Sequence, residues 1–331
     1  MDSLISGERF AEIADFKFSE EINLNFLDIN FKDNHIIHFQ NENHLCYINK
    51  NIILKDSDVI FCKTDFVELL FFALKKIDTV KNLILITHQS DRKVGRYLNL
   101  LKPKCIDKWF TVNPIINSEN LTPIPLGIAN STSVSNIKIE SFLNSQRTEI
   151  GNKKIYANFN LNTNYYHRFK VLKNLKIFKD IEFDINDKLH IEEYVQKIKD
   201  NKYIICPEGN GPDTHRFWEA MYLGSTPIVF KNVHNKNLRD LPAVFIDKIQ
   251  DINYLKENLG ETSNKKLYFE YWKNLIFEEK TIGFNEVAII YNVKIFNLIY
   301  KLLILKQKIY SYIKKIKFLF IKIHKKVSKI V

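Results

Sequence analysis

The sequence predicts an α/β protein built from two domains and a helical tail. Three observations support this prediction. Apolar segments of strand length alternate with helical segments along residues 1–285, which is typical of parallel sheets covered by helices. Residues 206–229 combine a strand end, a glycine-containing loop, a helix and a second strand. Beyond Glu286 the chain contains eleven lysines and no acidic residue.

The first predicted domain covers residues 1–145. Its apolar segments 58–64 (DVIFCKT) and 82–88 (NLILITH) have the length and β-branched composition of buried strands. The segment 65–77 (DFVELLFFALKKI) between them has the apolar periodicity of a helix. A strand, a helix and a second strand in this order predict a parallel sheet.

The second predicted domain covers residues 150–285 and follows the polar segment QRTEIGNKK. Its strand-like segments are KKIYANFNL, IEFDIN, KYIICPE, STPIVF and PAVFID, and its helical segments cover 165–176, 190–200 and 214–223. Two Rossmann-like domains that face a cleft are the simplest arrangement of these elements. Ligands of such sheets bind beyond the carboxyl ends of the strands.

The loop after the strand KYIIC has the residues of a tight turn into a helix. Gly209 and Gly211 allow backbone conformations that are closed to other residues. Asp213 or Thr214 can cap the helix that follows. We expect this helix over residues 215–223, because a glycine comes next and an apolar strand resumes after it.

The start of this helix predicts an anion-binding site. Its first turn has unpaired N–H groups and a partial positive charge, and both suit a phosphate. Arg216 adds a cation, and Glu219 lies three residues later on the same helix face. A cation for a diphosphate and a carboxylate for ribose hydroxyl groups suit a nucleotide. An ordinary surface ion pair is the alternative interpretation of these two residues; the glycine loop favours the nucleotide site.

The pattern P-x-G-x-G, D-T-H-R-x-W-E-A and L-G-S-x-P-I-V resembles the donor-site segment of exostosin-like glycosyltransferases, nearest to the ribitol xylosyltransferase-like branch. The segments ILITHQSD, KWFTVNP, IPLGIAN and IYANFNLNTNYYHRF agree with it, and together they span roughly half of the chain. The resemblance implies a two-domain GT-B fold. It also implies transfer of a sugar from a nucleotide diphosphate without a metal bound in a D-x-D site. We therefore expect an inverting transfer of a hexose or pentose to a glycan or lipid-linked acceptor, with no further cofactor.

The resemblance implies a set of donor-binding residues. They are Arg216, Glu219, Glu208, Gly209, Asn210, Gly211, Thr214, His215, Asn158 and Arg168. Without the resemblance, the asparagine-rich run around Asn158 would indicate only turn chemistry.

Inverting transfer needs a base that removes the proton of the acceptor hydroxyl group. Asp91 and His88 follow the strand LILIT and are the candidates, at the acceptor side of the cleft. Glu208 is a competing carboxylate. A histidine at a strand end is as often a structural residue, so this assignment stays open between the three side chains.

The composition argues against several other classes of protein. The four cysteines form no CxxC pair and have no histidine at zinc-finger spacing, which predicts buried thiols and no metal site. Asp56-Ser57-Asp58 spells D-x-D but precedes its strand, and we interpret it as a turn. The N-terminal residues lack a signal-peptide pattern and no run of 18 apolar residues occurs, so we expect a cytoplasmic protein that does not span a membrane.

Residues 287–331 are predicted to form a basic amphipathic helix. The body up to Glu286 carries 38 Lys and Arg against 38 Asp and Glu, so the formal charge of +11 belongs to the tail and no nucleic-acid partner is expected. Lysines recur every seven residues from Lys294 to Lys329, each followed by Ile or Leu. This pattern favours peripheral association with an anionic membrane surface.

A coiled coil and an RNA-binding arm are the alternatives for the tail, and its first two turns, 288–299, could pack on the body. The alternative for the whole protein is a non-catalytic polyanion- or membrane-binding scaffold that retains a nucleotide-sugar fold.

Overall fold

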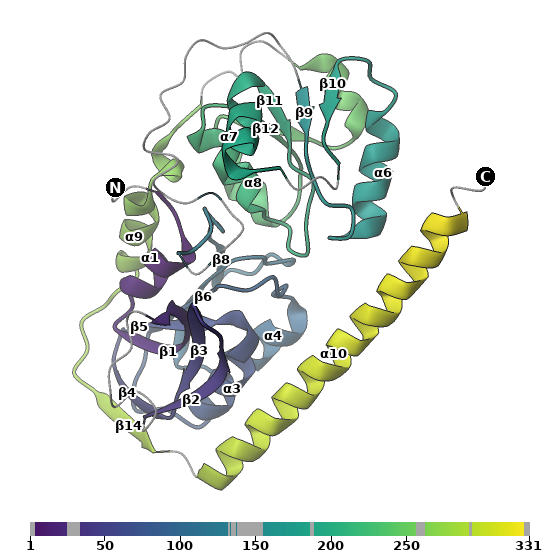
Figure 1. Ribbon diagram of the computed structural model, residues 1–331. Coiled ribbons are helices and arrows are strands. Elements are labelled where there is room, and N and C mark those ends of the chain that lie inside the picture. Colours follow the sequence, from purple (N-terminus) through teal and green to yellow (C-terminus); the bar gives the residue numbers. More distant parts are fainter. Residues whose placement is uncertain are drawn as a thin grey trace.

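The computed structural model describes residues 4–24, 34–131, 133, 137, 155–185, 189–255, 262–290 and 293–327. Within these ranges the chain forms two α/β lobes and a long C-terminal helix that runs alongside both (Figure 1). The predicted α/β class is therefore confirmed.

The first lobe contains a seven-stranded mixed sheet with the order β2-β3-β1-β5-β6-β7-β8. Neighbours are parallel from β1 to β8, whereas β2 and β3 pair antiparallel. The strands are β1 (Phe16–Asn23), β2 (His35–Gln40), β3 (His44–Asn49), β5 (Val59–Lys63), β6 (Leu83–His88), β7 (Ile106–Thr111) and β8 (Leu121–Pro123).

The predicted parallel sheet is thus wrong at one edge of the first lobe. Only residues 41–43 join β2 to β3, and the side-chain oxygen of Asn41 accepts hydrogen bonds from the backbone N–H groups of Asn43 (2.8 Å) and His44 (2.9 Å). A connection this short joins antiparallel strands, because parallel neighbours need a long crossover.

Helices cover both faces of the first sheet. The N-terminal helix α1 (Gly7–Glu12) packs on one face. The short 3-10 helix η2 (Thr64–Phe66) together with α3 (Val67–Leu74) and α4 (Arg96–Leu101) packs on the other. The central strand β6 is buried along its whole length, as its continuous apolar sequence predicts.

The second lobe contains a five-stranded sheet in which all neighbours are parallel, with the order β10-β9-β11-β12-β13. All five predicted strands are present. They are β9 (Ile155–Ala157), β10 (Ile181–Phe183), β11 (Tyr203–Ile205), β12 (Thr226–Phe230) and β13 (Val244–Ile246). The direction of the strand order reverses between β9 and β11, which is where ligands of such sheets bind.

The predicted helices of the second lobe are also present. Helices α7 (Ile191–Asp200) and α8 (His215–Tyr222) contribute to the core on one face of the sheet, and α6 (Tyr165–Leu175) packs on the other. Three 3-10 helices follow, η3 (His234–Leu238), η4 (Ile249–Tyr254) and η5 (Lys265–Leu267).

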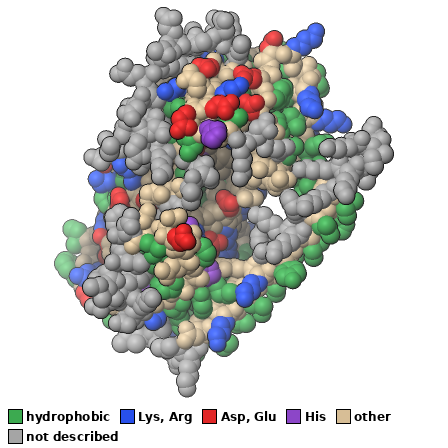
Figure 2. All heavy atoms as spheres, in the orientation of Figure 1, with side chains coloured by type: hydrophobic (Ala, Val, Ile, Leu, Met, Phe, Trp, Pro, Cys, Tyr) green, Lys and Arg blue, Asp and Glu red, His purple; other side chains and the backbone are tan. Residues whose placement is uncertain are grey.

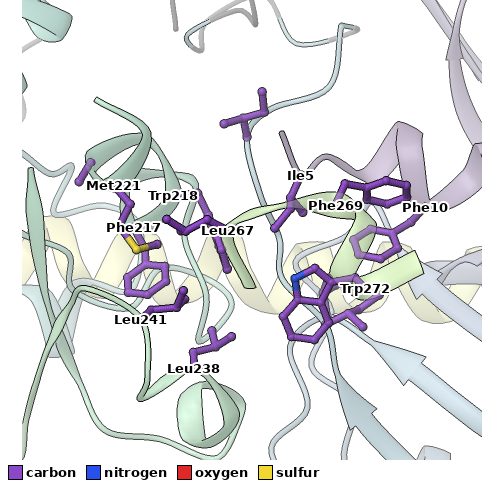
Figure 3. Packing of buried hydrophobic residues seen from close by; sticks show 14 of the residues in the cluster. Ile5, Phe10, Phe217, Trp218, Met221, Leu238, Leu241, Leu267, Phe269 and Trp272 are labelled. Atoms are coloured by element: carbon purple, nitrogen blue, oxygen red, sulfur yellow. The ribbon is translucent and has the colours of Figure 1, made fainter. Parts of the chain in front are cut away.

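One hydrophobic cluster joins the two lobes. It includes Phe10 of α1, Trp218 of α8 and Trp272 of α9 (Phe269–Phe277), all of them buried. The ring of Phe10 contacts Phe269 edge-on, with 5.2 Å between ring centroids. Figure 3 shows how side chains from α1, α8 and α9 meet in this cluster. The lobes therefore share a packed core on this side.

After α9 the chain returns to the first lobe. The strand β14 (Glu286–Ile290) pairs antiparallel with β4 (Asn51–Lys55), and α10 (Val293–Val327) follows. The predicted helical tail is confirmed for α10, but its predicted start is wrong, since residues 287–290 form a strand. These residues form a separate two-stranded sheet with β4, which offers them an edge to pair with.

Candidate functional site

A large pocket lies between the two lobes and beside α10. Its volume is about 1580 Å³, and we call it the interdomain pocket. Figure 2 shows the surface hollowed between the lobes. Its lining includes Gln89, Asp91, Asn162, Gly209, Asn210 and His215. Five of the predicted site residues therefore line it together, namely His88, Asp91, Gly209, Asn210 and His215.

Arg168 ties the loops after β9 and β11 to each other. Its guanidinium group donates hydrogen bonds to the backbone carbonyl groups of Asn160 (2.9 Å), Glu208 (2.9 Å) and Pro207 (3.3 Å). The side chain is buried. These carbonyl groups occupy much of the hydrogen-bond donor capacity of the guanidinium group. Arg168 therefore positions the two loops, and few of its N–H groups remain for a ligand.

Arg216 lies at the first turn of α8, close to the end of β9. Its Nη2 atom donates to the side-chain oxygen of Asn158 at 3.4 Å, and its guanidinium carbon lies 5.9 Å from the centre of the Tyr194 ring. Its Nε atom is buried and has no hydrogen-bond partner among the described residues. A buried donor without a hydrogen-bond partner destabilises the folded state. A ligand oxygen that accepts a hydrogen bond from Nε would remove this cost.

The two guanidinium groups make this end of the second sheet electropositive. Burial, and next the positive charge of Arg216, lower the pKa of Arg168 to about 10. Both arginines stay charged at neutral pH. The N-cap of α8 is Thr214, one of the two predicted candidates, although its side chain makes no capping hydrogen bond. The helix start therefore adds its own partial positive charge to the same region.

Glu219 is less accessible than the sequence indicated. Its side chain is buried, and its Oε2 atom accepts a hydrogen bond from the hydroxyl group of Tyr194 at 2.9 Å. Glu208 is half-buried, and its Oε1 atom accepts from the side-chain amide of Asn232 at 2.9 Å. Neither carboxylate is part of the lining of the interdomain pocket.

Gly209 and Gly211 serve close packing and not unusual backbone angles, which corrects the sequence interpretation. Among the described glycines only Gly127 and Gly224 have a positive φ angle. A Cβ atom on Gly211 would lie 2.6 Å from Cγ of Asn113, which belongs to the other lobe. The loop after β11 is therefore pressed against the first lobe.

His88 is a structural residue in this geometry. Its Nδ1 atom accepts a hydrogen bond from the backbone N–H of Gln89 (2.7 Å), and its Nε2 atom lies 3.1 Å from the carbonyl oxygen of Pro125. Because a carbonyl only accepts, Nε2 carries the proton. Burial lowers the pKa of His88 to about 3. The neutral ring has no lone pair left to take the proton of the acceptor hydroxyl group, which argues against His88 as the base.

Asp91 is exposed at the rim of the pocket and reaches across it. Its Oδ2 atom accepts a hydrogen bond from the side-chain amide of Asn210 at 2.8 Å. The contact joins the loop after β6 to the loop after β11. Of the candidate bases, Asp91 is the carboxylate that lines the interdomain pocket.

Sequence reasoning missed a polar cluster on the first-lobe side of the pocket. Lys63 pairs with Glu21 (2.9 Å) and donates to the carbonyl group of Gln89. Gln89 itself has a left-handed backbone (φ 56°), and its side-chain oxygen accepts from the N–H of Glu21 at 2.8 Å. These residues end β1, β5 and β6. Their position at strand ends was the one signal that could have found them.

Asp213 was predicted only as a possible helix cap, yet it joins the lobes. Its Oδ2 atom accepts hydrogen bonds from the backbone N–H of Leu126 (2.8 Å), the indole N–H of Trp218 (2.9 Å) and the ring of His234 (3.1 Å). Burial alone would raise the pKa of Asp213, but the interactions with His234, Leu126 and Trp218 more than offset it and lower that pKa.

The expectations about thiols and D-x-D agree with the structure. All four cysteines are buried and free. Asp56 and Ser57 form a turn in which the carboxylate of Asp56 accepts hydrogen bonds from the N–H groups of Lys81 (2.7 Å) and Asn285 (3.0 Å). In the part of the chain that the structure describes, no three His, Cys, Asp or Glu side chains gather in a way that could hold a metal ion.

Among the described helices, none combines the length and the hydropathy needed to cross a membrane. Neither a family model nor a curated protein matches this chain.

Proposed function

We propose that this protein is a glycosyltransferase of the GT-B type that moves a sugar from a nucleotide diphosphate sugar to an acceptor bound in the interdomain pocket. The observation that carries the proposal is the carboxyl end of the second sheet. There the strand order reverses, two guanidinium groups lie close together and a helix begins. Guanidinium groups and the N–H groups at a helix start are the donors that bind a diphosphate at such a position in a sheet. The resemblance of residues 206–229 to the donor segment of exostosin-like enzymes supports it.

In this proposal the diphosphate of the donor lies at Arg216 and the N–H groups of the first turn of α8. The Nε donor of Arg216 is buried and has no partner among the described residues, which supports this placement. The ribose would lie toward Glu219, displacing the hydroxyl group of Tyr194 from its carboxylate. Arg168 and Asn158 hold the loops that form the floor of this site.

The proposed reaction is a displacement at the anomeric carbon. The acceptor hydroxyl oxygen forms a bond to that carbon while the bond from the carbon to the diphosphate oxygen breaks. The hydroxyl proton passes to the carboxylate of Asp91, and the nucleoside diphosphate leaves with the bonding electron pair, stabilised by Arg216. Asp91 is preferred to His88 because its carboxylate is exposed in the pocket while both ring nitrogens of His88 are occupied.

The donor site is tested by binding and turnover with a panel of UDP, GDP and CMP sugars. Arg216→Ala removes a charged donor, which is worth about 1.5–3 kcal/mol, so donor affinity should fall roughly 10- to 100-fold. Arg239→Ala, at an exposed arginine of the same lobe, is the control and should bind as the parent does. If no sugar nucleotide binds, or if Arg216→Ala leaves affinity unchanged, the enzyme proposal fails and the scaffold alternative takes its place.

The base is tested separately. Asp91→Asn keeps the shape of the side chain but cannot take the proton, so transfer should slow by about 100-fold or more while donor affinity stays the same. Asp107→Asn, at an exposed aspartate of the same lobe, is the matched control. Equal rates for Asp91→Asn and the parent would assign the base to another residue.

We also propose that the protein is cytoplasmic and associates with an anionic membrane surface through α10. Large apolar side chains lie exposed along the outer side of this helix, some of them visible in Figure 2. They are Ile295, Leu298, Leu302, Leu305, Ile309, Tyr312, Ile313, Ile316, Leu319, Phe320 and Ile323. At 100° per residue they form one stripe, and Lys301 and Lys308 flank it. We call this set the outer stripe. Such a helix suits a membrane surface rich in acidic lipids.

Membrane association is tested by co-sedimentation with phosphatidylglycerol vesicles. The triple variant Leu302→Ser, Ile309→Ser, Ile316→Ser should sediment far less, because each side chain loses apolar area that the lipid would cover. A control with Ile177, Ile282 and Tyr254 changed to serine, all exposed elsewhere, should sediment like the parent. Binding should also weaken with salt, since the flanking charges are all lysines. Equal sedimentation of the two triple variants would contradict the proposal.

A further inference from the structure

Helix α10 contacts both lobes and lies beside the interdomain pocket. Near its start Phe296 and Leu303 are buried in the core of the first lobe. Lys306 pairs with Glu68 at 2.8 Å, and the hydroxyl group of Tyr300 lies 3.1 Å from the ring of His38. Near its other end Ile321 is buried in a cluster of the second lobe. The helix therefore spans from one lobe to the other, as Figure 1 shows.

The inner side of α10 forms part of the pocket wall. Leu303, Lys306, Gln307, Lys317, Phe320 and Ile321 all line it. The same helix thus presents the outer stripe to its surroundings and a second set of residues to the pocket. The pocket opens next to the surface that we propose to lie on a membrane.

Phe320 belongs to both surfaces. It is 61 % exposed and counts among the outer stripe, yet it also lines the interdomain pocket. Ile321, the next residue of α10, belongs to the same buried cluster as Tyr165 of α6. Tyr165 and Tyr166 also line the pocket, and the centroids of their rings are 5.5 Å apart. Tyr166 is 64 % exposed. An apolar and aromatic path therefore continues from the outer stripe into the pocket.

The lining also contains side-chain amides. Asn162, Asn164, Asn210 and Gln89 lie on the pocket wall, and Asp91 accepts a hydrogen bond from Asn210. Side-chain amides both donate and accept hydrogen bonds, which suits a head group rich in hydroxyl groups. The pocket lining thus combines apolar side chains of α10 and α6 with side-chain amides, beside Lys306 and Lys317 of α10. This mixed polarity suits an amphiphile.

From this polarity we infer that the acceptor is a membrane-anchored glycolipid. Its apolar chain lies along Phe320 and Tyr166, and its sugar head reaches the amides near Asp91. The inference rests on the proposed transferase function and names the acceptor class of the same site. An aliphatic chain gains more from this apolar wall than a water-soluble glycan does, because the hydroxyl groups of the glycan would lose hydration there.

The test uses binding of two sugars that differ only in their tail. A decyl β-glucoside that carries a diazirine in its chain is applied below its micelle concentration and without vesicles, and methyl β-glucoside serves as the competitor. After illumination, labelled peptides are mapped by mass spectrometry. We expect labels on α6 around Tyr165 and Tyr166 and on α10 around Phe320, and weak competition by methyl β-glucoside.

Two neighbouring variants separate the pocket from the membrane surface. Phe320→Ser removes a side chain that lies in both, whereas Ile316→Ser removes one of similar exposure that belongs only to the outer stripe. Labelling of the α6 peptide should fall about fivefold or more in Phe320→Ser, since apolar contact is lost, and stay unchanged in Ile316→Ser. Both residues are exposed, so neither variant is expected to unfold the protein.

The inference is overturned if the α6 peptide stays unlabelled, if both variants reduce its labelling equally, or if methyl β-glucoside competes as well as the unlabelled decyl glucoside. None of these readouts depends on turnover. Failure of the donor experiment with Arg216 would instead remove the transferase function while leaving the amphiphile result standing.

Discussion

At the scale of single residues, hydrogen-bond partners decide which polar side chains are free for chemistry. His88 and Arg168 were both candidates, and each is buried with most of its donors and acceptors engaged by backbone groups of the surrounding loops. Asp91 lines the interdomain pocket, and the Nε atom of Arg216 has no hydrogen-bond partner among the described residues. The candidate site therefore depends on a few side chains that other residues hold in position.

The buried neutral His88 should make folding sensitive to acid. In the unfolded chain its pKa is near the ordinary 6.5, whereas burial lowers the pKa of the folded state to about 3. Above pH 6.5 the ring is neutral in both states. Below it the unfolded state binds the proton, so the free energy of unfolding falls by up to about 1.4 kcal/mol per pH unit until pH 3.

The measurement compares melting temperatures at pH 7 and pH 5. His38 and His167 also have a pKa lowered by burial, so they contribute to the same loss. The drop in melting temperature should be smaller in His88→Gln than in the parent, and unchanged in His190→Gln, an exposed histidine. An equal drop in all three proteins would mean that His88 is charged or exposed in the folded state.

At the scale of elements, α10 has two apolar sides with different roles. The inner side packs on the lobes through Phe296, Leu303 and Ile321, and the outer stripe faces away from them. A 35-residue helix is about 52 Å long, enough to reach from one lobe to the other. Its inner packing positions the outer stripe, so both properties come from one amphipathic sequence.

Two adjacent leucines of α10 should differ sharply in their effect on stability. Leu303 is buried against the first lobe, and Leu303→Ala should cost about 2 kcal/mol or more in the free energy of unfolding. Leu302 is 56 % exposed, and Leu302→Ala should change it by less than about 0.5 kcal/mol. Urea unfolding followed by circular dichroism measures both. Similar values for the two variants would contradict the docking of α10 on the first lobe.

At the scale of the whole molecule, close contacts between the lobes surround the pocket. Asp213 accepts from the N–H of Leu126, the ring of His215 lies 2.7 Å from the carbonyl oxygen of Gly127, and Gly211 lies against Asn113. Together with the shared hydrophobic cluster, these contacts hold one side of the two lobes together. The position of Asp91 relative to the loop after β11 depends on them.

A change at Gly211 should disturb this contact between the lobes. Gly211→Ala would push a methyl group into Asn113 and should cost about 1–3 kcal/mol of stability. Asn113→Gly removes the obstacle and suits the left-handed backbone of that position (φ 57°), so the double variant should recover most of the loss. Melting temperatures of the two single variants and the double variant measure the coupling. Gly95→Ala, whose nearest neighbour would be 3.3 Å away, is the control. Additive effects would contradict the predicted clash.

Much of the second lobe was predictable from the sequence. Its five strands and three helices are local patterns of apolar spacing, glycine and proline, and the start of α8 follows from the loop before it. The first lobe was predictable only in part. Strands β2 and β3 carry polar residues and little alternation, so their antiparallel pairing left no clear signal.

The amphipathic pattern of α10 and the loop-to-helix turn before Arg216 follow from the sequence itself, because both arise from residues that are neighbours along the chain. Three other features do not follow from the sequence. They are the pairing of residues 286–290 with β4, the hydrogen bonds that occupy the ring of His88, and the hydrogen bonds by which Arg168 joins two loops. These features join positions far apart in the sequence. Which partners meet over such separations depends on how the two sheets and the final helix pack, and only the folded chain brings them together.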